Sequence, residues 1–566
     1  MRDFCPSLAV LVVLLKLVGA APAIPTHGKR ASPSVTLSLG TVVGSTTLSV
    51  DKFAGIPFAE SPTGNLRLAP PQKLNISYGT LDATGSGPAC PQMYSSTSGG
   101  LLDEVLSYLT DNPFFQTVDD ETEDCLTVTV QRPSGTAADA KLPVLFWIFG
   151  GGFELGSPQM YDATDLIANG VSIGMPFVFV AVNYRVAGFG FMPGKEILAA
   201  RASNLGLLDQ RMGLEWVQDN IAAFGGDPSK VTIWGESAGS ISVFDQMALY
   251  DGDNTYNGNT LFRGAIMDSG SIVPADPVDG VKGQAIYDAV VDKAGCSSSS
   301  DTLQCLRNLD YADFLAAANS VPGILSYNSV ALSYVPRPDG TVLTASPEIL
   351  VQDGKYAAVP MIIGDQEDEG TLFSLFQSNI TTETELIDYL SSIFFYDATV
   401  EQITELVATY PSDPSDGSPF DTGILYEVYP VFKQLAAILG DLSFTLTRRI
   451  FLETASSVNP DVPSWSYLSS YDYGTPILGT FHASDLLQVF YGILDNYASN
   501  AIQTYYINFA YNLNPNEGNT NYMNWPEWSA NQELMQFNAA SGNLLADDFR
   551  SNSSDWIKNN VAVLHI

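Results

Sequence analysis

A serine lies between two glycines in the segment Gly235-Glu-Ser-Ala-Gly239, which matches the pattern G-x-S-x-G. In this pattern the chain turns sharply from a strand into a helix, and the turn lifts the serine hydroxyl clear of the sheet. The apolar run Val231–Trp234 predicts the strand, and Ser240–Leu249 predicts the helix. The Ala238 N–H would then lie at a helix N-terminus, where a developing oxyanion is stabilised. The pattern therefore indicates nucleophilic catalysis by Ser237.

A serine hydroxyl is a weak nucleophile and needs a general base. The chain has three histidines. His27 lies in an N-terminal segment that we expect to be removed, and His565 is the penultimate residue. We therefore predict that the base is His482, in Gly479-Thr-Phe-His-Ala-Ser484, which follows the serine as in the chain order of the α/β-hydrolases.

The base in turn needs a carboxylate that orients the imidazole and stabilises its charged form. A predicted strand, Val359–Ile363, leads into an acidic loop that lies between the serine and the histidine in the sequence. This loop offers four candidates, Asp365, Glu367, Asp368 and Glu369. Spacing alone does not choose among them, and the remaining three would form a solvated acidic loop.

Three glycines follow another apolar strand, Pro143–Phe149, in Gly150-Gly-Gly-Phe153. The segment is similar to the HGGG-type loop that supplies backbone N–H groups to an oxyanion, with Phe149 in place of the histidine. A phosphate-binding loop is the rival interpretation, but no Lys-Ser/Thr pair follows. Gly188-Phe-Gly190 likewise lacks the helix and the acidic residue of a dinucleotide site.

The elements around these residues alternate between strands and helices. Phe177–Val182 and Gly264–Met267 are further apolar runs, and Leu205–Phe224 has helical spacing with one apolar stripe. Strands that are apolar throughout and alternate with helices predict a mostly parallel sheet covered on both faces. The expected fold class is α/β, with a large central sheet flanked by helices.

Composition excludes several classes of protein. Of the 566 residues 45% are hydrophobic, which rules out bulk disorder, and no linker composition divides the chain. The formal net charge of −37 argues against nucleic acid as a partner, because phosphates require clustered Lys and Arg. After the N-terminal segment, no apolar run of eighteen residues predicts a transmembrane anchor.

The N-terminus predicts export. Arg2 precedes the apolar run Leu8–Ala20, and small residues follow, as in a signal peptide cleaved after residue 20 or as late as residue 23. Residues 21–30 would be a pro-segment ending in Lys29-Arg30, which leaves residues 31–566 as one catalytic domain. We therefore expect a secreted, extracellular protein. Three Asn-x-Ser/Thr sequons are candidate glycosylation sites, namely Asn75, Asn379 and Asn552.

Four cysteines remain after removal of the signal peptide, Cys90, Cys125, Cys296 and Cys305. An even number in an oxidising compartment indicates disulfides, and three connectivities exist. We favour Cys90–Cys125 and Cys296–Cys305, because the loops between nearest neighbours close most readily. We expect no metal site, since no Cys-x-x-Cys is present and histidine is nearly absent.

These motifs together resemble the type-B carboxylesterase/lipase family, which includes the cholinesterases and has the α/β-hydrolase fold. Within that family they are similar to the fungal Candida rugosa-like lipases and sterol esterases. The resemblance rests on Asn204–Val217, Phe224–Gly239, Asp368-Glu-Gly-Thr371, Trp147–Glu154, Tyr334–Gly340, Gly417–Leu425 and Gly479–His482. It implies Glu369 as the acid and Gly151, Gly152 and Ala238 as the donors of the oxyanion hole. The family's cysteine pairing is the one favoured above.

The resemblance also implies a disulfide-hinged lid between Cys90 and Cys125. In this loop five apolar residues fall on one helical face, namely Leu101, Leu102, Val105, Leu106 and Leu109. An ordinary surface helix is the alternative. We expect the apolar face to cover the site in water and to open at a lipid–water interface, and it could also mediate a homodimer.

The sequence thus predicts a secreted serine ester hydrolase, a lipase or sterol esterase, that cleaves long-chain fatty-acid esters through an acyl-enzyme and requires no cofactor. Ile241 and Phe373 are candidate walls of the acyl site, although core residues would look the same. A short-chain carboxylesterase is the alternative, and a non-catalytic adhesion-type protein is disfavoured because the serine and the histidine are both present. The role of Glu236, a structural carboxyl or an electrostatic contributor, stays open.

Overall fold

The computed structural model describes residues 32–93, 118–471, 475–491, 496–519 and 521–566. The predicted signal and pro-segments and all five predicted lid residues lie outside these ranges. Pro33–Ile566 form one compact unit. No helix among the described residues is long and apolar enough to cross a membrane.

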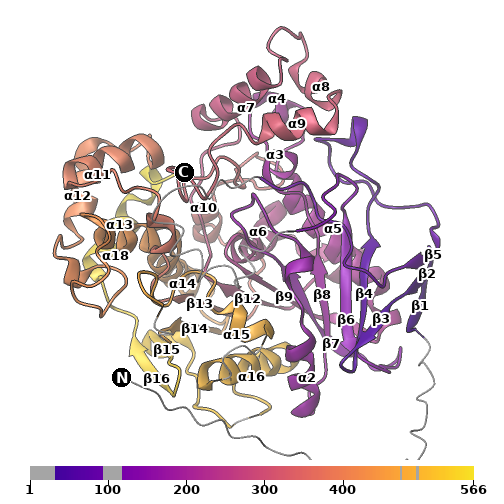
Figure 1. The fold of residues 1–566 in the computed structure, drawn as a ribbon. Helices are drawn as coiled ribbons and strands as arrows, with labels where there is room; N and C mark the ends of the chain where they lie inside the picture. Colours follow the sequence, from indigo (N-terminus) through magenta and orange to yellow (C-terminus); the bar gives the residue numbers. More distant parts are fainter. Residues whose placement is uncertain (1–31, 94–117, 472–474, 492–495, 520) are drawn as a thin grey trace, which may run out of the picture. The chain divides into compact units, whose positions relative to one another are not determined.

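Within the described residues, an eleven-stranded sheet forms the centre of this unit (Figure 1). In spatial order its strands are β16 (Gly542–Ala546), β15 (Glu533–Phe537), β14 (Ser464–Ser469), β13 (Met361–Gln366), β12 (Gly264–Asp268), β9 (Gly226–Glu236), β7 (Leu142–Ile148), β8 (Val178–Val182), β6 (Thr127–Pro133), β4 (Val50–Pro57) and β3 (Ser45–Thr47). The strands from β15 to β8 pair in parallel, and antiparallel pairs lie at both edges. The mostly parallel sheet that the sequence predicts is confirmed.

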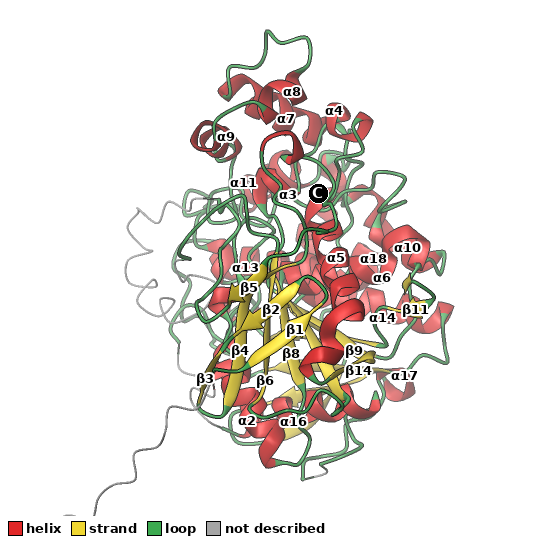
Figure 2. Ribbon diagram, turned by 90° about the vertical axis from the view of Figure 1, so that its right-hand side faces the viewer, coloured by secondary structure: helices red, strands yellow, loops and turns green. Residues whose placement is uncertain are grey.

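Smaller sheets and short helices surround this sheet. One sheet consists of β1 (Ser34–Leu37), β2 (Gly40–Val43) and β5 (Gly79–Asp82), which Figure 2 shows beside β4, and the other of β10 (Thr255–Tyr256) and β11 (Asn259–Thr260). The helices that connect or cover the strands are α2 (Thr164–Ser172), α3 (Ala187–Gly190), α4 (Lys195–Ala199), α5 (Leu205–Asn220), α6 (Ala238–Gly252), α7 (Val281–Lys293), α8 (Thr302–Arg307), α9 (Tyr311–Ala318), α10 (Pro347–Gln352), α11 (Glu383–Tyr389), α12 (Val400–Ala408), α13 (Phe432–Gly440), α14 (Leu446–Val458), α15 (Leu486–Tyr491), α16 (Tyr497–Asn512), α17 (Trp528–Asn531) and α18 (Ser551–Asn560).

Successive residues at the end of β9 show that helices cover both faces of the sheet. The ring of Trp234 lies 5.7 Å from that of Tyr506 in α16, between ring centroids. A side chain on the next residue, Gly235, would instead meet the backbone of Gly239 in α6. Because side chains alternate along a strand, α16 and α6 lie on opposite faces. Full burial on both faces explains why these strands read as continuous apolar runs.

Two disulfides fix loops outside the sheet. Cys90 is bonded to Cys125, and Cys296 is bonded to Cys305. This is the pairing that loop length and the family resemblance both favour. The first bond encloses the segment in which the lid is predicted, and both of its cysteines are fully buried.

Candidate active site

Ser237 occupies a sharp turn between β9 and α6. Its backbone has φ 57° and ψ −126°, a strained conformation for a residue with a side chain. The turn is held by the Ser237 N–H, which donates to the carbonyl oxygen of Asp268 at 2.9 Å. A side chain on Gly239 would collide with the backbone of Ile148 in β7, so only glycine permits this close approach. The strand, turn and helix agree with the predicted nucleophile elbow.

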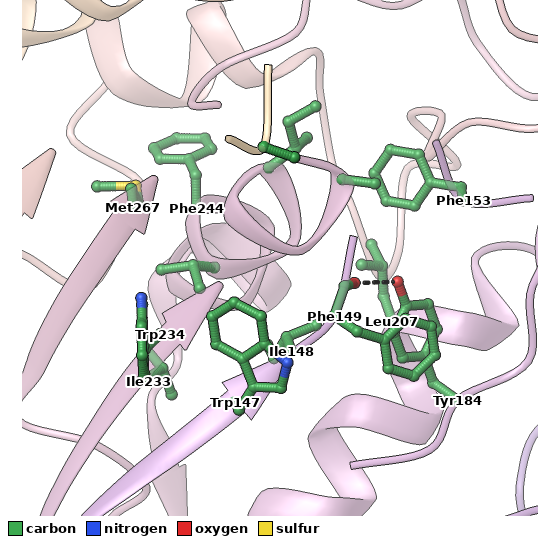
Figure 3. Packing of buried hydrophobic residues seen from close by; sticks show 14 of the residues in the cluster. Trp147, Ile148, Phe149, Phe153, Tyr184, Leu207, Ile233, Trp234, Phe244 and Met267 are labelled. Carbon is green, nitrogen blue, oxygen red and sulfur yellow. Dashed lines mark hydrogen bonds between the residues drawn. The ribbon is translucent and has the colours of Figure 1, made fainter. Parts of the chain in front are cut away.

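The glycine loop lies directly against this turn. A Cβ built on Gly150 would lie 2.9 Å from the Ser237 Cβ, and Gly151 and Gly152 have φ of 109° and 62°. Phe149, which stands where the family pattern has histidine, stacks on Tyr184 with ring centroids 4.2 Å apart. The Tyr184 hydroxyl donates to the Phe149 carbonyl oxygen at 2.7 Å (Figure 3). The loop therefore enters the site from a fixed position.

Glu154, a residue that the sequence analysis did not single out, supports the same loop. Its Oε2 accepts the Ile324 N–H at 2.7 Å, and Ile324 in turn lies over Gly152. The Glu154 carbonyl oxygen accepts the Met93 N–H at 2.8 Å. Complete burial raises the pKa of this carboxyl group to about 8, so the group is predominantly protonated at neutral pH.

His482 and Glu369 are brought together by the loops that follow β13 and β14. The distance between Nδ1 of His482 and Oε2 of Glu369 is 2.5 Å. The other oxygen of Glu369 accepts the Gln366 N–H at 2.7 Å, which fixes the carboxyl group. Both side chains are buried. This is the arrangement in which a carboxylate orients an imidazole for general base catalysis.

The other three acidic candidates have different partners. Asp365 forms an ion pair with Arg448 at 2.7 Å. Asp368 accepts N–H groups from Phe420 at 2.8 Å and Thr480 at 2.9 Å. Burial raises the pKa of Glu367 to about 8. Asp365 and Asp368 are buried and Glu367 is half-buried, so the three do not form the solvated acidic loop that the sequence analysis described.

The remaining edge of the imidazole faces the nucleophile elbow. Nε2 of His482 lies 3.4 Å from Oε1 of Glu236, the residue before Ser237. The ring itself packs against Phe373 and Phe444, with centroid distances of 5.0 and 4.5 Å. These contacts place the nitrogen that would take a proton beside the turn that carries the serine.

Additional buried carboxyl groups surround the elbow. Burial, with Asp485, Glu369 and Asp268 nearby, raises the pKa of Glu236 well above its usual value. The pKa of Asp485 is raised for the same reason. Burial also raises the pKa of Asp268, but only to about 6, because hydrogen bonds from Tyr506, at 2.6 Å, and from two further side chains favour its charged form. The low-dielectric surroundings thus favour the neutral form of Glu236.

An apolar cavity begins at the serine. Among the described residues that line it, Ser237, Ser443 and Thr447 carry the polar side chains. The other lining residues are Gly152, Phe153, Ala238, Ile241, Ile272, Val273, Pro274, Ile324, Val330, Leu332, Val335, Phe373, Phe394, Phe395, Leu442, Phe444, Ile450, Ile557, Val561, Leu564 and Ile566. Ile241 and Phe373, the predicted walls of the acyl site, are both among them.

Known proteins are similar in sequence to this chain over almost its full length. A family model described as the carboxylesterase family matches residues 31–552. The chain belongs to the carboxylesterase family. Its predicted enzyme class, a carboxylic ester hydrolase, is thereby confirmed.

Relatives of this carboxylesterase include fungal proteins that cover nearly all of it. The secreted triacylglycerol lipase LIP1 of Gibberella zeae is 62% identical over 96% of this chain and 93% of its own length. Lipase 4 of Diutina rugosa is 46% identical over 94% of this chain and 96% of its own length. Among solved structures, Aspergillus niger EstA superposes with a TM-score of 0.81 at 26% identity, over 95% of this chain and 99% of its own.

Some residues of the carboxylesterase site were not visible to sequence reasoning. Phe444 lies far from every motif in the sequence, and Glu154 gave no signal beyond its place after the glycine loop. Asp485 follows His482 by three residues, so its proximity to the site could have been suspected. The elbow and the glycine loop were found because each belongs to a short motif, whereas His482 was found because the other two histidines lie near the ends of the chain.

Proposed function

We propose that this carboxylesterase is a secreted lipase that hydrolyses long-chain fatty-acid esters. The observation that carries the proposal is the apolar cavity, because it starts at Ser237 and is lined by hydrophobic side chains that suit an acyl chain. The names of two relatives, a secreted triacylglycerol lipase and a lipase, support the same substrate class.

In the proposed mechanism Ser237 is the nucleophile and His482 the general base. The serine Oγ attacks the ester carbonyl carbon while Nε2 of the imidazole takes the hydroxyl proton. The protonated imidazole then donates this proton to the leaving alcohol, and water repeats the sequence on the acyl-enzyme. Glu369, 2.5 Å from Nδ1, keeps the ring in the productive tautomer and stabilises its charged form.

The proposed oxyanion hole consists of the backbone N–H groups of Gly151, Gly152 and Ala238. Positive φ at both glycines and the start of α6 at Ala238 support this assignment. Single donors of this kind contribute about 10²–10³ in rate in other serine hydrolases. A neutral Glu236 is consistent with it, because a second negative charge beside the elbow would oppose the developing oxyanion.

The pattern of residues 101–109, which lie outside the described residues, supports a second proposal from sequence alone. Its apolar face would cover the site in water and open at an interface. A rise in activity when an insoluble ester exceeds its solubility limit is the expected result, and a smooth saturation curve would contradict the lid.

Secretion predicts N-glycans. Asn75, Asn379 and Asn552 are all exposed, as glycan acceptors must be. We propose that these sequons are occupied when a eukaryotic host exports the protein. Removal of a mass increment by an N-glycosidase is the expected result, and a single unmodified mass before treatment would contradict occupancy.

The substrate class is tested by comparing kcat/KM on p-nitrophenyl acetate, p-nitrophenyl palmitate, triolein and cholesteryl oleate. A lipase is expected to prefer palmitate to acetate and to release oleate from triolein. Activity confined to acetate and butyrate would identify a short-chain carboxylesterase instead. The cholesteryl ester shows whether sterol esters are also cleaved.

A further inference from the structure

One loop exposes a continuous run of apolar side chains. The loop consists of residues 417–431 and directly precedes α13. Within it the exposed fractions of Ile424, Leu425 and Tyr426 are 74%, 61% and 36%. Single exposed aliphatic residues are ordinary on protein surfaces. Three consecutive ones leave apolar area in water without a packing partner, which is typical of an interaction surface.

A buried lysine, Lys433, fixes the conformation of the 417–431 loop by hydrogen bonds to two of its residues. Nζ of Lys433, a fully buried residue, donates to Oγ1 of Thr422 and to the carbonyl oxygen of Gly423, both at 2.7 Å. Burial of an ammonium group is unfavourable unless acceptors satisfy it. The hydrogen bonds therefore hold the segment next to Ile424 in one shape while the apolar side chains point into solvent.

The backbone of Lys433 closes the same loop. Its N–H donates to Oε2 of Glu427 at 3.0 Å, and its carbonyl oxygen accepts the Ser418 N–H at 3.0 Å. The start and the end of the 417–431 loop are therefore both attached to the first turn of α13. A loop tied at both ends presents its tip without further ordering when it meets a surface.

The loop is also connected to the candidate active site. The carboxyl group of Asp368, which precedes Glu369, accepts the Ser418 hydroxyl at 2.9 Å. At the other end, the Tyr429 hydroxyl donates to the carbonyl oxygen of Ser374 at 2.6 Å. Ser374 follows Phe373, a wall of the apolar cavity. An interface that binds residues 424–426 is therefore linked, through these hydrogen bonds, to the segment that contains Glu369 and Phe373.

Charge indicates what kind of surface fits. Residues 417–431 contain no Lys, Arg or His, and Asp421 is exposed beside the apolar run. The exposed Asp416 precedes the loop. An anionic membrane or a nucleic acid would be repelled, whereas a neutral lipid phase accepts aliphatic side chains without an opposing charge.

We propose that Ile424, Leu425 and Tyr426 form a docking surface that inserts into neutral lipid–water interfaces and holds the candidate active site against them. The proposal rests on the proposed function, since an ester-containing lipid phase is the substrate of a lipase. It is independent of residues 101–109, because the 417–431 loop is fixed by Lys433.

The test measures binding without catalysis, in a Ser237→Ala background. The double variant Ile424→Ser/Leu425→Ser is compared with its parent and with Val281→Ser, a control at a residue 91% exposed at the start of α7. The measured quantity is partition onto phosphatidylcholine-coated triolein droplets. We expect at least about a tenfold loss for the double variant and less than a twofold change for the control, because insertion withdraws aliphatic area from water.

Equal partition of the double variant and its parent would overturn the docking surface. A dimer in light scattering that the double variant abolishes, with droplet binding unchanged, would identify a surface for a second copy and would also overturn it. With Ser237 present, hydrolysis of dissolved p-nitrophenyl butyrate should stay unchanged in the double variant, which shows that its fold is intact.

The same variants separate this proposal from the proposed function. If the parent cleaves no long-chain ester but the partition difference persists, the lipase assignment fails and the docking surface stands. If the parent cleaves triolein and the double variant binds and cleaves it equally well, the lipase assignment stands and the docking surface fails.

Discussion

Oε1 of Glu236 lies 3.4 Å from Nε2 of His482, the ring nitrogen that the proposed mechanism uses as a base. An ionised carboxylate at this place would stabilise a proton on Nε2 and so disfavour the unprotonated nitrogen that takes the serine proton. Burial and the neighbouring carboxyl groups raise the pKa of Glu236 well above its usual value, which favours its neutral form. We therefore propose that Glu236, whose role the sequence left open, is a buried neutral acid.

Replacement of Glu236 by glutamine tests its protonation state. Because glutamine has the shape of the protonated acid, Glu236→Gln should change kcat/KM at pH 7 by less than about threefold. Steady-state hydrolysis of p-nitrophenyl butyrate measures this. A loss of a hundredfold or more would show that the ionised carboxylate acts in the reaction.

Glu367 and Glu369 lie in the same loop, so Glu367 provides a matched control for Glu369, the proposed carboxylate partner of His482. Glu369→Gln removes the carboxylate beside Nδ1 of His482 and is expected to lower kcat by about 10³–10⁴, as loss of the corresponding acid does in other triads. Glu367→Gln replaces a carboxyl group whose pKa of about 8 keeps it mostly neutral, so activity at pH 6 should be retained. Equal losses in both variants would contradict the assignment.

The strands and the elbow could be predicted because their signals are local. Parallel strands buried on both faces, such as β7 and β8, appear as short apolar runs. β14, Ser464–Ser469, was not predicted, since serines alternate with large residues along it. The Ser466 hydroxyl is satisfied by a residue of another element, because it accepts a hydrogen bond from Arg448 at 3.0 Å. No window of sequence shows that contact.

The choice of the acid illustrates the same limit at the site. Four carboxylates of one short loop have equivalent spacing from Ser237, and only their partners distinguish them. The carboxyl oxygens of Asp368 accept hydrogen bonds from the N–H groups of residues that lie 52 and 112 positions later in the sequence. Glu369 is left facing the imidazole as a result. Family resemblance predicted this residue, whereas spacing could not.

Buried carboxyl groups predict a stability maximum in acid. The pKa values of Glu154, Asp245 and Glu367 are raised to about 8, and those of Asp365 and Asp368 to about 7. A pKa raised above its unfolded value near 4 contributes stability below pH 4, and this is lost as pH rises through 7–8. Tm should therefore fall between pH 5 and pH 8.5. A constant or rising Tm across this range would contradict the assigned protonation states.

A carboxyl group whose pKa is lowered, rather than raised, sets the acid limit of the pH range in which the protein is most stable. Arg448 and Arg449 lower the pKa of Asp547 to about 2 despite its burial. Its stabilisation is present above pH 4 and is lost as pH falls through 2. The predicted maximum therefore lies near pH 4, because Asp547 is already ionised there and the unfolded chain has not yet lost the protons that the carboxyl groups with raised pKa keep in the folded state.

Replacement of Asp245 tests the contribution of one of the carboxyl groups with raised pKa by itself. It lies buried in α6, and neither carboxyl oxygen has a hydrogen-bond partner among the described residues. Asp245→Asn should leave Tm at about pH 4 nearly unchanged and reduce the fall towards pH 8.5, because the amide has no charge to bury. Asp139→Asn, at an exposed residue, is the control and should follow the parent. An Asp245→Asn curve parallel to the parent would refute the explanation.

The cavity predicts a change in chain-length preference. Ile241, in the first turn of α6, lines the cavity next to Ser237. Ile241→Trp would fill this space, and the ratio of kcat/KM for palmitate over acetate should fall at least about tenfold, because acetate needs little of it. Ile241→Leu, which conserves volume, should keep the ratio. An unchanged ratio in the tryptophan variant would place the acyl chain elsewhere.

The central claim is that Ser237, activated by His482, is the nucleophile. Such a serine attacks the phosphorus of a p-nitrophenyl alkylphosphonate, p-nitrophenolate leaves, and the alkylphosphonate stays bonded to the serine oxygen. Mass spectrometry after digestion should find one equivalent of phosphonate on Ser237, with no label in Ser237→Ala and about 10³-fold slower labelling in His482→Ala. Stoichiometric labelling of another residue, or full esterase activity in Ser237→Ala, would contradict the claim.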